Sequence, residues 1–193
     1  GVAAHPTSPK KELRWEDWSL DIDGVEWLNA GKQWRDGSWP ELLLAAARYA
    51  VRPSPALVTL LDRPDSSIRQ WDNAVARSIV GLGGIDAHAW NQGMGIGKAL
   101  PSYEELFRVF AIRVELERAW AGNAEVDAET ILQSLRAGRT FTAIDALGAP
   151  AEFTYTGLSD GRTIPMGARV SEDVEMTLRA RAVGPVGAEI LLF

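Results

Sequence analysis

The chain has 193 residues, of which 46% are hydrophobic and 24% charged, a balance typical of a globular protein with a sizeable core. Its net charge of −6, without any basic run, gives no electrostatic reason to expect nucleic acid as a partner. The absence of cysteine excludes disulfides and thiolate metal ligands, so a bound metal would need histidine, carboxylate or water ligands. No apolar stretch is long enough to span a bilayer and no signal peptide is visible. Cytoplasmic and exported locations both stay open, because the lack of cysteine does not fix the compartment and the N-terminus is expected to be missing.

Residues 1–149 alternate apolar runs with segments of helical periodicity, a pattern that predicts β/α units. Apolar runs predict parallel strands at residues 2–4, 25–28, 79–82 and 141–144, and a further strand at 112–116. Helices are predicted at residues 41–51 after Pro40, from Asp65 or Ser66, and from Tyr103, where Ser102 and Glu105 form a capping box. Asp127 is expected to cap a last helix, which ends at Gly138.

After Pro150 the helical period disappears, and strands are predicted at residues 153–156, 174–182 and 188–193. Apolar residues alternate with polar or charged ones from Val174 to Arg181, which indicates a half-exposed antiparallel strand. We therefore predict two domains, a β/α part over 1–149 and the beginning of an all-β module over 150–193. The chain enters a strand almost at once and closes on an apolar run, so we expect it to be a fragment of a longer protein.

The stretch from Gly81 to Trp90 carries the strongest chemical signal. An apolar strand ends at two glycines, and Asp86 and His88 follow two residues apart, a spacing that puts both side chains on one face of an extended segment. They could hold a metal ion between them, or they could be a turn aspartate beside a solvated histidine. The other histidine, His5, also ends an apolar strand, and polar groups at the carboxyl ends of parallel strands carry the chemistry of such sheets.

Together these stretches resemble the polymerase-and-histidinol-phosphatase (PHP) family of metal-dependent phosphoesterases. The matching pieces are Ala4-His5-Pro6, the strand 24–29 that ends Glu-Trp-Leu-Asn, and Gly84-Ile85-Asp86-Ala87-His88. The helix and strand over residues 135–141 also resemble the closing unit of that family. The resemblance covers roughly residues 1–149. It implies an α/β fold, namely the C-terminal half of a distorted seven-stranded β/α barrel, followed here by the start of the all-β module.

The resemblance also implies a site and a reaction. His5 would be the metal-ligand histidine of the family's third motif, and Asp86 and His88 would be the metal ligands and catalytic residues of its fourth. The cofactors would be two or three divalent metal ions, variously Zn, Mn, Fe or Mg, and the substrate a phosphorylated small molecule. The family's first motif, His-x-His, and its second have no counterpart in this sequence.

Three ligands cannot fill a multi-metal hydrolytic site, because each ion needs several protein ligands and an open position for water. We therefore expect this chain to be inactive by itself and to pair with an N-terminal half of the same protein that supplies the missing ligands. The alternative is a non-catalytic binding or structural protein in which the Asp-x-His motif is a vestige.

Three other charged residues are weaker candidates. Arg35 and Lys98 lie in loops after predicted strands and could contact a substrate phosphate, although a solvated surface charge is the commoner role for each. Glu26 lies inside its strand, where it is expected to pair with a neighbour rather than to bind metal.

Overall fold

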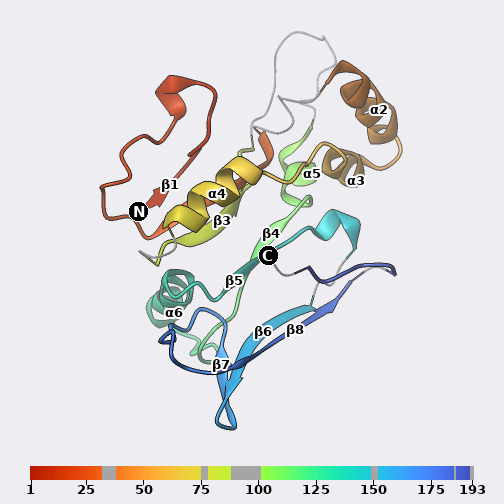
Figure 1. Ribbon diagram of the computed structural model, residues 1–193. Coiled ribbons are helices and arrows are strands. Elements are labelled where there is room, and N and C mark those ends of the chain that lie inside the picture. Colours follow the sequence, from red (N-terminus) through yellow and green to blue (C-terminus); the bar gives the residue numbers. More distant parts are fainter. Residues whose placement is uncertain (32–37, 75–77, 88–100, 149–151, 185, 192–193) are drawn as a thin grey trace. The chain divides into compact units, whose positions relative to one another are not determined.

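The structure, a computed structural model, describes residues 1–31, 38–74, 78–87, 101–148, 152–184 and 186–191 (Figure 1). Within these ranges the chain is a mixed α/β protein with five α-helices and three small sheets. The helices are α2 (Trp39–Tyr49), α3 (Pro53–Val58), α4 (Asp65–Ala74), α5 (Tyr103–Phe107) and α6 (Ala124–Arg136), and short 3₁₀ turns occur at η1 (Lys11–Leu13) and η3 (Asp145–Leu147). The strands are β1 (Val2–Ala3), β2 (Gly24–Asn29), β3 (Val80–Gly84), β4 (Ala111–Val114), β5 (Thr140–Ala143), β6 (Glu152–Ser159), β7 (Arg162–Pro165) and β8 (Thr177–Val183).

The chain divides into two compact units. The first contains Gly1–Ala111 and Ile144–Leu147, and the second contains Ile112–Ala143 and Gly148–Phe193. No closed barrel is formed by the strands in the described ranges, so the predicted barrel half is seen only as separate small sheets.

In the first unit, β1, β2 and β3 form a parallel sheet in the order β1-β2-β3. Ala3 pairs with Val25, and Val25 pairs with Gly81 on the other side. The prediction of parallel strands in these three stretches is confirmed. Because all three strands run in the same direction, their carboxyl ends lie at one edge of the sheet.

A β-bulge interrupts β2. Glu26 pairs with Leu82, whereas Leu28 pairs with the very next residue of β3, Gly83, so Trp27 is an extra residue between them. In a regular strand, side chains three residues apart point to opposite faces, but one extra residue brings them to the same face.

The bulge thus places Val25 and Leu28 on one face and Glu26 and Asn29 on the other. Helices cover the first of these faces, and Figure 1 shows α4 lying across the sheet. The buried residues around Val25 are Ala3, Ile22, Ala74 and Ile79, with Trp15, Trp18 and Trp71 against them. The buried residues around Leu28 are Ala30, Leu57, Val58, Leu106, Val109 and Phe110.

Local signals in the sequence explain where the helices begin. Ser38 and Glu41 form a capping box at the start of α2. Pro40 is the second residue of this helix, next to the start predicted from the sequence. The predicted capping box of Ser102 and Glu105 is confirmed at α5.

In the second unit, α6 begins three residues before the predicted cap. The N-cap is Asn123, whose side chain accepts hydrogen bonds from two backbone N–H groups of the first turn. The prediction of Asp127 as the cap is wrong; its carboxylate instead accepts from the backbone N–H groups of Ala121 and Gly122. Gly138 follows the helix with a φ of 70°, which confirms its predicted role.

The strand predicted at residues 141–144 forms as β5, but it pairs with β4 in a separate two-stranded sheet rather than with β1–β3. The tail forms the sheet β7-β6-β8, and both of its pairings are antiparallel, as predicted. The alternation along β8 does not give a buried face, because every residue of the strand is exposed. Residues 188–191, predicted as a strand, lie outside the regular elements.

Candidate functional site

His5 lies two residues after β1, at the carboxyl edge of the parallel sheet. Its backbone φ is 52°, in the left-handed region that residues with a side chain seldom adopt. The turn is held by a hydrogen bond from the backbone N–H of Ser8 to the carbonyl of His5, 3.0 Å long. The imidazole is 24% exposed, so it lies at the surface of the edge rather than in the core.

Glu26, in the middle of β2, reaches the end of each neighbouring strand. Its Oε2 accepts a hydrogen bond from the backbone N–H of His5 at 2.9 Å and lies 3.5 Å from Nδ1 of the same residue. Its Oε1 lies against Gly84, where a Cβ atom would overlap it. With only 12% of the side chain exposed, this carboxylate is held between β1 and β3.

Asn29, the last residue of β2, contacts the same imidazole. Its side-chain nitrogen lies 3.0 Å from Nδ1 of His5, and the residue is buried. Glu26 and Asn29 are three residues apart, and the bulge at Trp27 is what allows both to face His5.

Asp86 lies two residues after β3, at the same edge of the sheet as His5. Its φ is 49°, so two of the four described non-glycine residues with positive φ are His5 and Asp86. Its carboxylate lies close to Gly31, just after the end of β2: a Cβ atom built on Gly31 would be only 2.6 Å from Oδ2 of Asp86. Strained backbone of this kind concentrates at functional sites, where the surrounding structure holds it in place.

The structure thus places His5 and Asp86 after the two outer strands of one parallel sheet, on either side of the end of β2. Neighbouring strands lie about 4.8 Å apart, so the two outer strands are separated by about 10 Å. Three further candidates, His88, Arg35 and Lys98, lie outside the described residues. The convergence of His5, Asp86 and His88 on one point stays a prediction. Within the described ranges, no three His, Asp or Glu side chains are close enough together to hold a metal ion.

The sequence places Asn29 at the tip of its strand, where it is expected to lie near His5 and Asp86, but it does not predict that Glu26 faces the same imidazole. Glu26 was expected to pair with a neighbour, and it does so with His5, but the spacing of the two residues predicts opposite faces of a regular strand. The available signal was Gly84, whose lack of a side chain leaves room beside β2 for the Glu26 carboxylate.

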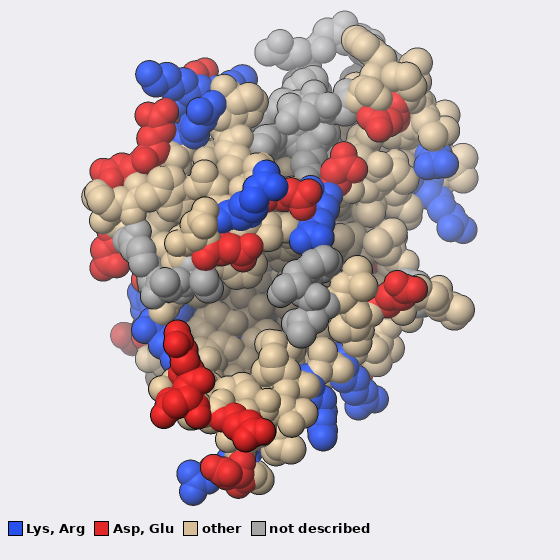
Figure 2. Space-filling model, in the orientation of Figure 1, with Lys and Arg blue, Asp and Glu red and all other residues tan. Residues whose placement is uncertain are grey.

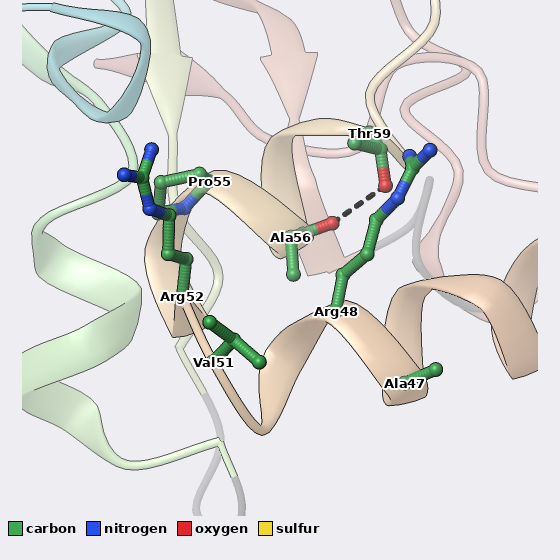
Figure 3. Close-up of a pocket in the computed structure, with 7 residues that line it drawn as sticks. All are labelled: Ala47, Arg48, Val51, Arg52, Pro55, Ala56 and Thr59. Atoms are coloured by element: carbon green, nitrogen blue, oxygen red, sulfur yellow. Dashed lines mark hydrogen bonds between the residues drawn. The ribbon is translucent and has the colours of Figure 1, made fainter.

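A second feature of the first unit is a pocket of about 420 Å³ beside α2 and α3 (Figure 3). Its lining residues are Ala47, Arg48, Val51, Arg52, Pro55, Ala56 and Thr59. Thr59 Oγ1 donates a hydrogen bond of 2.7 Å to the carbonyl of Ala56 at its wall. The pocket is mostly apolar, its two arginines are exposed, and none of the strand-end residues lines it. The candidate site is therefore the strand-end edge.

On the face drawn in Figure 2, Lys and Arg side chains lie among Asp and Glu side chains and do not form one continuous basic surface. None of the helices in the described part of the chain is long and apolar enough to cross a membrane.

The chain matches no protein-family model, no curated protein and no solved structure. The function must therefore be argued from the chemistry of the strand-end residues.

Proposed function

We propose that this chain carries part of the metal centre of a phosphoesterase that resembles the PHP family, and that its β/α region belongs to a barrel of that kind. One observation carries the proposal: His5 and Asp86 both follow strands of a single parallel sheet and both lie at its carboxyl edge. This edge is where parallel β/α folds hold catalytic residues. The left-handed backbone at both residues adds support, because such strain is retained where a side chain must be aimed.

The donor atoms at this edge suit a divalent cation. They are the imidazole of His5 and the carboxylate of Asp86, and nitrogen and oxygen ligands of this kind bind Zn, Mn, Fe and Mg. His5 and Asp86 would hold the ion together with His88. A bound ion would lower the pKa of a water molecule and neutralise charge on the phosphoryl oxygens.

Neighbouring residues of the chain hold the two proposed ligands, His5 and Asp86, in place. Glu26 and Asn29 contact Nδ1 of the His5 imidazole at 3.5 and 3.0 Å, and Glu26 also accepts a hydrogen bond from the backbone N–H of His5 at 2.9 Å. Gly31 lets the Asp86 carboxylate approach the end of β2 closely, because any side chain there would collide with it. Both proposed ligands thus lie within two residues of a strand end, and sites supported by strands hold ligands more accurately than free loops do.

The test compares this chain with the full-length product of its gene in hydrolysing an aryl phosphate with added Mn²⁺ or Zn²⁺. The resemblance requires further ligands from outside the chain, so we expect no turnover from these 193 residues alone and turnover from a protein that supplies the missing motifs. In that protein, His5→Ala, Asp86→Ala or His88→Ala should remove turnover. Asp160→Ala is a matched control, since Asp160 also has a φ of 49° but lies in the second unit.

Two results would overturn parts of the proposal. Turnover by the 193-residue chain that is lost in Asp86→Ala would show that the additional ligands are unnecessary. A full-length protein that stays inert with every metal and phosphoester would exclude the reaction and favour a non-catalytic binding or structural protein.

A further inference from the structure

We propose that Glu26 and Asn29 are positioning residues for His5: they hold the imidazole proton on Nδ1 and so leave the lone pair of Nε2 for a divalent cation. This inference deepens the proposed metal centre and rests on it only where the cation is concerned. Which ring nitrogen of His5 carries the proton follows from the contacts that His5 makes within this chain.

The first step concerns which ring nitrogen is engaged. Among the described residues, both side-chain contacts to the imidazole are made at Nδ1, by Asn29 at 3.0 Å and by Glu26 Oε2 at 3.5 Å. In a neutral imidazole one nitrogen carries the proton and the other a lone pair, and the partner of one nitrogen decides which.

The second step concerns the charge of Glu26. Its Oε2 is fixed by the backbone N–H of His5 at 2.9 Å, and the carboxylate is mostly shielded from solvent. A carboxylate oxygen held close to Nδ1 attracts an N–H there and repels a lone pair. Glu26 therefore favours the tautomer that has its proton on Nδ1.

The third step concerns the amide of Asn29. One end of this group is a donor and the other an acceptor, and rotation by 180° exchanges them with almost no change of shape. As the structure draws the amide, its nitrogen faces His5 and would donate to a lone pair on Nδ1; after the 180° rotation its oxygen would face His5 and accept from an N–H on Nδ1. The charge of Glu26 selects the second orientation, so both residues then stabilise the same tautomer.

As a consequence, the His5 imidazole already has the tautomer and orientation of a metal ligand in the metal-free protein. Histidine ligands commonly donate their second N–H to a carboxylate or carbonyl, which fixes the ring and raises its basicity. Glu26 also holds the strained backbone of His5 through the N–H hydrogen bond, so a single carboxylate controls both the turn and the ring.

The experiment reads the tautomer directly in ¹⁵N-labelled protein at about pH 8, where a histidine is ordinarily neutral. The chain has only two histidines, so a His88→Gln background leaves the His5 imidazole alone in a long-range ¹H–¹⁵N spectrum. We expect a protonated Nδ1 and an unprotonated Nε2. Glu26→Gln should shift the population toward protonated Nε2, because the new amide can donate to Nδ1. Glu16→Gln, an exposed position in the same unit, should change nothing.

Asn29→Asp is the conservative variant, because a carboxylate at this position can only accept from Nδ1. It should keep the proton on Nδ1 even if Glu26→Gln proves too unstable to study. A proton found on Nε2 in the otherwise unchanged chain would overturn the proposal, and so would a tautomer that does not respond to Glu26→Gln in a folded protein.

A Zn²⁺ titration of the full-length product of the gene, which supplies the ligands missing from this chain, with and without Glu26→Gln, separates the two proposals. Loss of a carboxylate behind a histidine ligand typically weakens metal affinity by about 10- to 100-fold, and Glu26→Gln should show a loss of this size. Protonated Nδ1 without Zn²⁺ binding would support the positioning role and exclude the metal centre. Zn²⁺ bound with equal affinity by both proteins would overturn the positioning role and leave the metal centre intact.

Discussion

Glu26 Oε1 lies against Gly84, in the space that any larger residue would fill. The carboxylate can stay within reach of His5 only because β3 offers no side chain at this point. Gly84 therefore contributes to the arrangement around His5, because its lack of a side chain leaves room for the Glu26 carboxylate that holds His5.

Gly84→Ala tests this dependence. The new methyl group must displace the Glu26 carboxylate, so we expect a loss of about 1–3 kcal/mol in the free energy of unfolding, typical of overpacking. In a Glu26→Ala background most of that loss should disappear, since residues in contact show interaction energies of about 0.5–3 kcal/mol. Urea denaturation of the four proteins measures the coupling. Gly184→Ala is the control, because a Cβ there would meet Ala188 at an ordinary 3.6 Å. Additive effects of the two changes would contradict the proposed contact.

The left-handed backbone at Asp86 predicts an inverted preference between glycine and alanine. Asp86→Gly should be more stable than Asp86→Ala by about 1 kcal/mol, because only glycine adopts this conformation without strain. Both changes remove the same carboxylate, so the difference between their free energies of unfolding reports the backbone strain at this position. At Ala128, inside α6, replacement by glycine should instead cost about 1 kcal/mol. Denaturation curves for the two Asp86 variants decide the matter, and an alanine variant as stable as the glycine variant would exclude the left-handed conformation.

The sequence predicted the sheet better than it predicted the site. Apolar runs and the glycines of β3 were sufficient to predict three parallel strands, because burial of a continuous apolar strand is a local property of composition. The same runs placed His5 and Asp86 after strands, and parallel pairing then brings them to one edge.

The bulge at Trp27 could not be read from the sequence, because it depends on how β2 pairs with β3. The strand tips of His5 and Asn29 were expected at one edge, but period-two alternation puts Glu26 and Asn29 on opposite faces, so Glu26 was not expected beside the His5 imidazole. Pairing partners were misjudged for the same reason: residues 141–144 have strand propensity, but propensity does not say that β5 pairs with β4. Alternation along β8 likewise indicates a strand, but it does not establish that either face is covered, and every residue of β8 is exposed.

The start of α6 gives a prediction that distinguishes two candidate caps. Asn123 Oδ1 accepts from the backbone N–H groups of Glu125 and Val126, each at 3.1 Å. Asn123→Ala should lower the free energy of unfolding by about 1 kcal/mol, whereas Asn123→Ser should retain most of it. Asn73→Ala, within α4, is the matched control and should cost nothing, since alanine favours a helix interior. Circular dichroism at 222 nm during urea unfolding provides the measurement, and an undiminished stability of Asn123→Ala would contradict the assigned cap.

The hydrogen bond from the Tyr49 hydroxyl to the Glu105 carboxylate predicts how stability depends on pH. Burial raises the pKa of Glu105, but hydrogen bonds from Tyr49 and Ser102 outweigh it and hold the pKa below its ordinary value of 4.5. A carboxyl group with a depressed pKa in the folded state stabilises the fold at any pH above its unfolded value. That stabilisation is lost as the pH falls below 4.5 through the lower folded-state pKa.

Glu105→Gln removes this titration and should flatten the fall in the free energy of unfolding below pH 4.5, while lowering stability at neutral pH. Tyr49→Phe should have a weaker effect of the same kind, because Ser102 still donates to Glu105 through its backbone N–H at 2.7 Å and its hydroxyl at 2.8 Å. Glu104→Gln is the matched comparison: Glu104 is an exposed neighbour in the same first turn of α5, and its carboxylate pairs with Arg108 at 2.7 Å instead of accepting from Tyr49 and Ser102. Urea denaturation at a series of pH values between about 3 and 7 measures the slopes. If Glu105→Gln and the unchanged chain lose stability in parallel below pH 4.5, the hydrogen bonds to Glu105 do not tie α2 to α5 as the structure indicates.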